Sequence, residues 1–357
     1  MIDAKICKWL MDNADAPIRY RVARELLQDE QAAKKIEGEL LENMTVQKWL
    51  KLLKPETPLQ HSVEYREHGC FDFCLENALP KLVQLGLHGG FVQIIDAIGA
   101  YAEQYNFSGI ATANLFLMAN VADETASKHM LGRLDKLHDF AKQKNYDIYI
   151  SEKEKAKLTA IPKRWKDKDF ISPELFKEGY CYPLIYDILG LHRLYDLKNH
   201  ETDDKINGVI SYISKDEFHD KISDGYGILI SGRYESGNPQ YHGMGWDPKY
   251  PGWHDVGSYI ESGGERVGAG VPKLLFFAQN IAKYPIARNT KWFAALLDHL
   301  EKYRTESGTY LFPQKWMQEN QGYAVQGHHI SFGENRRKKN WCEIESTVYM
   351  QLLWQNV

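Results

Sequence analysis

The chain lacks any run of about 18 apolar residues without charge, the length that a membrane-spanning helix needs. Its first residues, MIDAKICKWLMDNADAP, also lack the cationic region and long apolar stretch of a secretory signal. Cysteine is scarce, with five residues in 357, and the odd number argues against a disulfide framework. These absences predict a cytoplasmic protein with reduced thiols and without a transmembrane segment.

Neither sign of charge dominates. The chain has 44 Lys and Arg against 48 Asp and Glu, a net charge of -4. A domain-wide basic field, the mark of many nucleic-acid-binding domains, is therefore missing, and we expect no nucleic-acid partner. Apolar residues make up 43% of the chain, enough to bury a large core. Composition leaves the oligomeric state and any cofactor open.

Common nucleophile and nucleotide motifs are also missing, since neither GxSxG nor GxxxxGK[ST] occurs. One segment, HGCFDFCLE at positions 68–76, does contain residue types that bind zinc. Its Cys70 and Cys74 have the spacing of one helix face. The spacing is not that of a standard zinc site, and buried free cysteines are common core residues, so we predict no metal site here.

Amphipathic helices dominate the remaining sequence, with about twelve segments showing helical periodicity. In DAPIRYRVARELLQ, Asp15 can cap a helix, and Ile18, Val22 and Leu26 share one face. Other helices are apolar nearly all round and should be buried, so wet and buried helices alternate, as in two concentric layers. The clearest predicted helices are Ala32–Leu53, Phe71–Leu87, Phe91–Tyr105, Gly109–Val121, Thr125–Lys144, Tyr182–Tyr195, Asp204–Ile213, Glu265–Tyr284, Lys291–Tyr303 and Cys342–Gln355.

The helical pattern stops between Ser223 and Gly264, where aromatic residues alternate with glycines. Disordered segments are poor in aromatics, and long ordered loops in compact domains are usually functional. We therefore predict a binding loop inserted into a single domain over residues 1–357, with a second long loop at 305–340. The alternative is a packed loop that only closes one end of the domain. The predicted substrate-binding residues are Tyr182, Tyr234, Tyr241, His242, Trp246, Trp253, Arg266 and Trp341.

Four residues are candidate catalytic acids or bases: His254, Asp255, Glu265 and Glu343. A histidine beside a carboxylate can exchange a proton near neutral pH. Glu343 lies with Glu345 at the start of the last predicted helix, where a carboxylate could face a cavity. Each has a structural alternative, because an exposed histidine is ordinary and an acidic residue at a helix start stabilises the helix dipole.

Both ends of the chain resemble a known group of proteins. The opening WLMDNADAPIRYRVARELL, the segment ALPKLVQLGL, and the C-terminal SGTYLFPQKW with NWCEIESTVYMQLLW are similar to bacterial squalene-cyclase-like and prenyltransferase-like proteins of the terpenoid cyclase superfamily. The resemblance implies an α/α toroid of about six helix pairs around a central cavity, with long loops over one end, and the alternation of wet and buried helices agrees with it. The matching N-terminal residues are Trp9, Leu10, Pro17, Arg19, Tyr20 and Arg21.

The catalytic motifs of that superfamily are missing. No DxDD occurs, and the string nearest to DDxxD, at positions 203–207, lacks the third carboxylate. Three functions therefore stay open, since fold does not imply function. The protein could bind a hydrophobic or amphipathic small molecule as a cyclase- or prenyltransferase-like enzyme. It could be a carbohydrate-active toroid, either a lyase or a glycoside hydrolase. It could also be a non-catalytic helical scaffold, whose cavity would be filled by its own apolar side chains.

Overall fold

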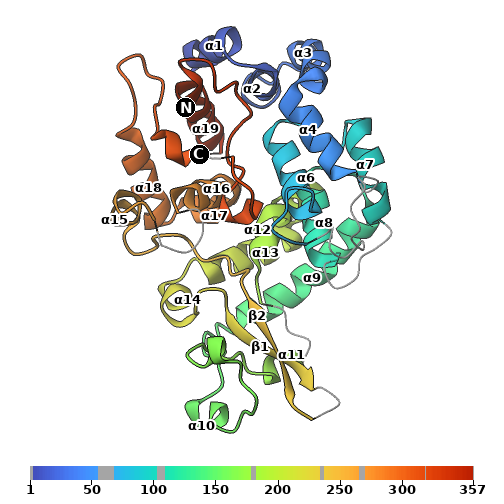
Figure 1. Ribbon diagram of the computed structural model, residues 1–357, viewed down its shortest axis with the longest axis vertical. Helices are drawn as coiled ribbons and strands as arrows, with labels where there is room; N and C mark the ends of the chain where they lie inside the picture. The colour runs from blue at the N-terminus through green and yellow to red at the C-terminus, as the bar shows by residue number, and fades with distance from the viewer. Residues whose placement is uncertain are drawn as a thin grey trace.

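The computed structural model describes residues 3–54, 68–102, 109–177, 182–233, 237–264, 270–317 and 319–356. Within these ranges the protein is mostly helical and has one antiparallel sheet of two strands (Figure 1). The predicted all-α class is confirmed at this level. No helix in these ranges is long and apolar enough to span a membrane.

The N-terminal helices are α1 (Ala4–Asn13), α2 (Ala16–Arg21), α3 (Glu30–Glu42) and α4 (Met44–Leu53). A π-helical turn, η1 (Val22–Leu26), follows α2 directly. The single helix predicted over Ala32–Leu53 is wrong, because Asn43 divides it. The Asn43 side chain accepts a hydrogen bond from the backbone N–H of Thr45 at 2.9 Å and so caps α4.

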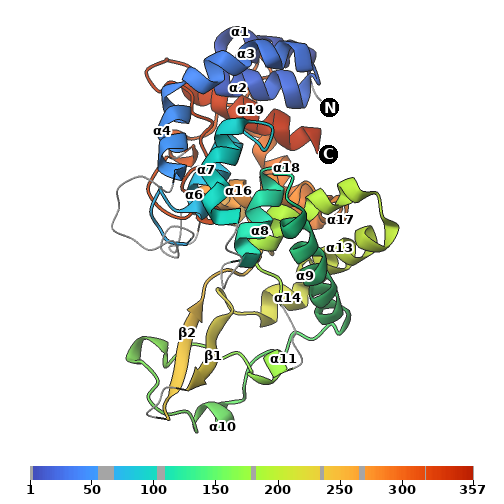
Figure 2. The ribbon, with the colours of Figure 1, turned by 90° about the vertical axis from the view of Figure 1, so that its right-hand side faces the viewer.

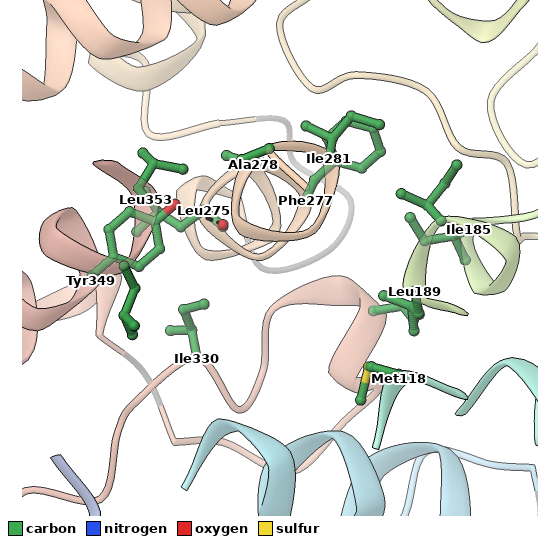
Figure 3. Packing of buried hydrophobic residues seen from close by; sticks show 14 of the residues in the cluster. Met118, Ile185, Leu189, Leu275, Phe277, Ala278, Ile281, Ile330, Tyr349 and Leu353 are labelled. Atoms are coloured by element: carbon green, nitrogen blue, oxygen red, sulfur yellow. Dashed lines mark hydrogen bonds between the residues drawn. The ribbon is translucent and has the colours of Figure 1, made fainter. Parts of the chain in front are cut away.

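Five helices form the buried centre: α6 (Leu75–Gln84), α8 (Gly109–Met118), α12 (Ile185–Gly190), α16 (Val271–Ile281) and α19 (Trp341–Gln355). The 3-10 helix η3 (Leu191–Leu197) continues α12. Figure 3 shows Tyr349 of α19 beside Leu275 of α16, with Leu189 of α12 and Met118 of α8 on the other side of the cluster. Each such buried side chain contributes about 1.5–3 kcal/mol of hydrophobic stabilisation.

Amphipathic helices surround this centre and keep one face in water. They are α7 (Val92–Ala102), α9 (Glu124–Lys142), α13 (His200–Ile213), α14 (Asp216–Lys221), α15 (Val256–Glu261), α17 (Pro285–Arg288) and α18 (Lys291–Glu301). The predicted α9 and α18 lie within two residues of the observed bounds because polar caps, Asp123 and Thr290, precede them.

A smaller lobe lies at the end of the molecule opposite the N-terminal helices (Figures 1 and 2). It contains the hairpin of β1 (Gly227–Arg233) and β2 (Pro239–Met244), in which Ile230 faces Tyr241. Short helices α10 (Glu152–Lys155), η2 (Lys163–Trp165) and α11 (Glu174–Lys177) flank the hairpin. Phe170, Ile228 and Tyr241 form a separate small core here.

Candidate active site

Polar side chains meet where two central helices begin. Glu76 lies in the first turn of α6 and Tyr186 in the first turn of α12, and their exposed fractions are 2% and 3%. The hydroxyl of Tyr186 and the backbone N–H of Gly69 both donate to the Glu76 carboxylate. His68 Nδ1 lies 2.8 Å from Glu76 Oε1. One buried carboxylate therefore holds an imidazole and a phenol together.

The segment 68–74 is fixed by Asn77 in the first turn of α6. The Asn77 amide donates to the carbonyls of Gly69 and Phe71, both at 2.8 Å, and its Oδ1 accepts from Ala324 N at 2.8 Å. The predicted helix start at Phe71 is therefore wrong, since α6 begins at Leu75 after a turn. Cys70 is exposed and Cys74 is buried, so they do not share a helix face.

Aromatic rings form the walls beside His68. The ring of Trp246 lies 5.0 Å from His68, 5.6 Å from Tyr186 and 5.1 Å from Tyr323. The Trp246–Tyr323 contact joins the segments 223–264 and 305–340, where the sequence predicts long loops. The first of these segments forms the β1–β2 hairpin and α15 instead of one long loop. The His68 side chain is 46% exposed, so this cluster opens to solvent. We call His68, Glu76, Tyr186, Trp246 and Tyr323 the His68 site.

Burial and charge set the protonation of the His68 site. Burial lowers the pKa of His68, but the hydrogen bond and negative charge of Glu76 outweigh it and leave that pKa raised. Burial, reinforced by Glu76, raises the pKa of Tyr186 well above its usual value of 10. Tyr186 therefore stays protonated, and His68, the exposed member of the pair, binds a proton more readily than a free imidazole does.

A deeper ionic contact anchors the second long loop to α6. Lys81 is 1% exposed, and its Nζ donates to Glu319 Oε2 at 2.5 Å, Ser331 O at 2.8 Å and Ser331 Oγ at 2.9 Å. Burial acts to raise the pKa of Glu319, but Lys81 overcomes it and lowers that pKa to about 2. This contact holds the segment that carries Tyr323 against the helix that carries Glu76.

In α19, the carboxylate with full burial and a strongly raised pKa is Glu345, rather than the predicted Glu343. Glu343 accepts a hydrogen bond from Thr309 Oγ1 at 2.5 Å. Glu345 is fully buried and accepts from the backbone N–H groups of Phe332 and Glu334, at 3.0 and 3.1 Å. Its Oε2 has no hydrogen-bond partner among the described residues. Burial raises the pKa of Glu345 to about 7.

Three predicted residues, Trp253, His254 and Asp255, line an open cleft of about 400 Å³ between α15 and α18. Their polar atoms bind protein groups. Trp253 Nε1 donates to Asp216 at 2.8 Å, and His254 Nε2 lies 2.7 Å from Asp220. The Asp255 carboxylate caps α15, and its hydrogen bonds from Ser258 lower its pKa. The cleft does not contain the His68 site.

The other predicted residues are scattered. Tyr182 is buried with its ring 4.5 Å from that of Tyr226. Tyr241 donates to the carbonyl of Thr159 at 2.7 Å, and His242 is exposed on β2. Trp341 lies at the start of α19, where the Arg336 guanidinium is 4.4 Å from its ring. The predicted Tyr234, Glu265 and Arg266 lie outside the described residues.

Of the predicted residues, the His68 site therefore contains only Trp246. Glu76 and Tyr186 are separated by 110 positions, so no local spacing could have joined them. The segment 68–76 contains residue types that bind zinc. In the part of the chain that the structure describes, however, no group of three or more His, Cys, Asp or Glu residues could hold a metal ion. The sequence does place a His, His68, shortly before a Glu at a helix start, Glu76. That pattern is too common to predict an active site.

Comparison of the chain with known protein families, with curated proteins and with solved structures finds no match. The function therefore has to be argued from the geometry of the site.

Proposed function

We propose that the protein is an acid–base enzyme acting on an amphipathic, hydroxyl-bearing small molecule, with carbohydrates as the substrate class. The observation that carries this proposal is the buried Glu76 carboxylate, which orients His68 beside the rings of Trp246 and Tyr323. Aromatic rings offer an apolar face and, in Trp and Tyr, a hydrogen-bonding edge, which suits a sugar ring. A positioned His is the commonest general acid or base.

For the fold, we propose the α/α toroid of a squalene-cyclase-like protein. In support, α6 and α12 start at the His68 site, and Gly327 of the loop around Tyr323 lies against Pro272 at the start of α16. The opposite ends also come together. Arg21 donates to the carbonyl of Gln84 at the end of α6, and Gln355 at the end of α19 donates to Glu25. Parallel central helices with amphipathic helices outside are the arrangement of a toroid.

Terpenoid cyclisation is the alternative, but the carboxylates favour it less. Protonating an alkene needs a carboxylic acid that faces the substrate. Glu76 already accepts hydrogen bonds from His68, Gly69 and Tyr186. Glu345, whose pKa of about 7 leaves it half protonated at neutrality, is fully buried. A scaffold role is favoured least, because polar and ionisable groups occupy the centre of the protein.

Among carbohydrate reactions, elimination fits better than hydrolysis by two carboxylates. Glycosidases flank the scissile bond with a pair of carboxylates. In the His68 site, Glu76 is the carboxylate that contacts His68, and it is committed to orienting that ring. His68 would remove a proton from carbon, the new double bond would form, and the glycosidic oxygen would leave with the bonding electron pair.

The test is turnover of a panel of oligosaccharides and uronic-acid polysaccharides, with isoprenoid diphosphates as a second panel, and mass spectrometry of the products. We expect an unsaturated sugar product, and we expect His68→Ala to lower kcat/KM by about 100-fold or more. His254→Ala is the matched control because His254 also pairs with a carboxylate at 2.7 Å and is 61% exposed. Turnover of isoprenoids alone would favour the cyclase-like alternative, and no turnover in either panel would contradict both.

Substrate binding gives a separate prediction for the aromatic wall. We expect Trp246→Ala to weaken the affinity of the sugar product or substrate about tenfold, because one aromatic contact contributes about 1 kcal/mol or somewhat more. Trp253→Ala is the control, since Trp253 is also half-buried in the loop but stacks on His219 at 4.1 Å, apart from the His68 site. Calorimetric titration would measure both. Equal losses in the two variants would contradict the assignment of Trp246 to the site.

A further inference from the structure

Cationic side chains gather at the opposite ends of the helices that start at the His68 site. Arg21 ends α2, Arg24 lies in the π-helical turn η1, Arg193 lies in η3 beyond α12, and Lys283 follows α16. We call these four residues the cationic cluster. Figure 2 shows α2, α17 and the C-terminal end of α19 on one side of the molecule, and η1 and Lys283 adjoin these elements. Isolated π-helical turns inside helices occur often at functional sites.

The carboxylates near the cationic cluster do not balance it. Both oxygens of Glu25 accept from Arg21, each at 2.7 Å. Asp196 is largely exposed and lies 4.0 Å from Arg193. Among the described residues, Arg24 makes no hydrogen bond or ion pair, and Lys283 bonds to Asn280 Oδ1 at 3.1 Å. The charges of Arg24 and Lys283 also act on Glu25, so the four cations share two carboxylates, Glu25 and Asp196.

Two buried donors or acceptors in this region are also without a partner. Arg193 Nε and His192 Nδ1 are buried and make no hydrogen bond within the part of the chain that the structure describes. Leaving a buried charged group unsatisfied costs more than the usual 1–3 kcal/mol or so for a neutral one. The Arg193 side chain is still 37% exposed, so a ligand from solvent can reach it.

The cations also repel one another. Burial, followed by the charges of Arg193 and Arg21, lowers the pKa of Lys283 to about 7. Burial and Arg24 lower the pKa of Arg193, and the opposing charges of Asp196 and Glu25 do not restore it. One structural explanation is that cations stabilise helix C-termini by binding free carbonyls. Arg21 does this at Gln84, but Arg24 and Arg193 donate to no described carbonyl. An anion would relieve the repulsion.

We propose that Arg24, Arg193 and Lys283 form a binding site for a phosphate group, as the free ion or as a small phosphate monoester. Guanidinium groups match phosphate oxygens with paired hydrogen bonds, and an ammonium adds a point charge. The doubly charged phosphate suits three poorly compensated cations better than a monovalent anion does. The proposal does not depend on the chemistry at His68, because it rests on different residues.

The test is calorimetric titration of the whole protein with inorganic phosphate at an ionic strength held constant with sodium chloride. We expect saturable binding, and we expect Arg24→Gln and Arg193→Gln each to weaken it at least about tenfold, the loss of one charge-assisted contact. Arg19→Gln is the control because it removes the same charge from α2, where Arg19 pairs with Glu39 at the surface. We expect it to bind as the wild type does. Absence of saturable binding, or equal affinity in all three variants, would overturn the proposal.

A measurement on the unmodified protein avoids any effect of substitution on folding. Inorganic phosphate should slow the labelling of Lys283 by an amine-reactive ester at neutral pH, with mass spectrometry as the readout. Lys291, which is exposed on α18, should label at an unchanged rate. Equal labelling of Lys283 with and without phosphate would count against the site. Titration with glycerol 3-phosphate then identifies the preferred form, since the tighter of the two ligands is the better match.

Discussion

Arg133→Met is expected to lower the free energy of unfolding by about 3–5 kcal/mol, the usual result of removing one partner of a buried ion pair. Arg133 of α9 donates to both oxygens of Asp187, from Nε at 2.6 Å and from Nη2 at 2.7 Å. Asp187 is fully buried, and the neutral donors that remain to it are Asn114 and the backbone of Leu184. Without Arg133, its negative charge would be poorly compensated. Urea denaturation measures the change.

Lys205→Met is the matched control for this prediction. Lys205 of α13 also pairs with an aspartate of α9, Asp135, at 2.8 Å, but the pair lies at the surface. Exposed ion pairs contribute about 0–1 kcal/mol, so the control should be nearly neutral. The double variant Arg133→Met with Asp187→Asn should recover part of the loss, because the uncompensated charge is then gone. A loss for Arg133→Met no larger than that for Lys205→Met would show that this contact does not join α9 to α12 as argued.

Glu345→Gln is expected to flatten the dependence of stability on pH around neutrality. The folded-state pKa of Glu345 is raised to about 7, above the ordinary value of 4.5. Between these two values the folded state holds a proton that the unfolded state has lost. The contribution of Glu345 to stability is therefore complete below about pH 4.5 and is lost as the pH rises through 7. Glu345→Gln has no ionisable carboxyl group at this position, so its stability does not fall in this way as the pH rises.

We therefore expect the wild type to lose stability relative to Glu345→Gln by up to about 3 kcal/mol between pH 5 and pH 8. The difference in unfolding free energy between the two proteins, measured at several pH values, isolates this one group. Glu343→Gln is the matched substitution for loss of a carboxyl group from the same helix, because Glu343 is half-buried and accepts a hydrogen bond from Thr309. A difference that stays constant with pH would contradict the buried, unpartnered state of Glu345 Oε2.

The elements predicted best are those with local signals. The observed α9 begins after Asp123 and buries Met130, Leu134 and Leu137, which is the apolar spacing visible in the sequence. Cap and stripe both lie within one helix, so neighbouring residues suffice to define it. Prediction failed at the start of α6, where Asn77 binds backbone carbonyls on one side and accepts from the distant Ala324 on the other. Asn77 fixes the turn at 68–74, and that turn replaces the first part of a predicted helix.

The residues of the His68 site were harder still to predict from local sequence. Among the described residues of the aromatic segment, most aromatic side chains pack within the fold or bond to nearby groups, and Trp246 is the one that reaches the His68 site. His254 and Asp255 are adjacent in the sequence, yet each binds a different partner, Asp220 and Ser258. Adjacent residues need not act together, whereas Glu76 and Tyr186, far apart in the chain, contact each other.

The sequence by itself determined the all-α class, because apolar periodicity and caps act over a few residues and are written in the order of the chain. It also indicated that helical periodicity stops at 223–264 and at 305–340. Only the tertiary structure decided that the first segment forms a hairpin and α15, that the two segments meet at Trp246 and Tyr323, and that Glu76 lies between His68 and Tyr186. The physical reason is that burial and contact between distant segments fix both the partners and the pKa of each polar group, and neither is a property of local sequence.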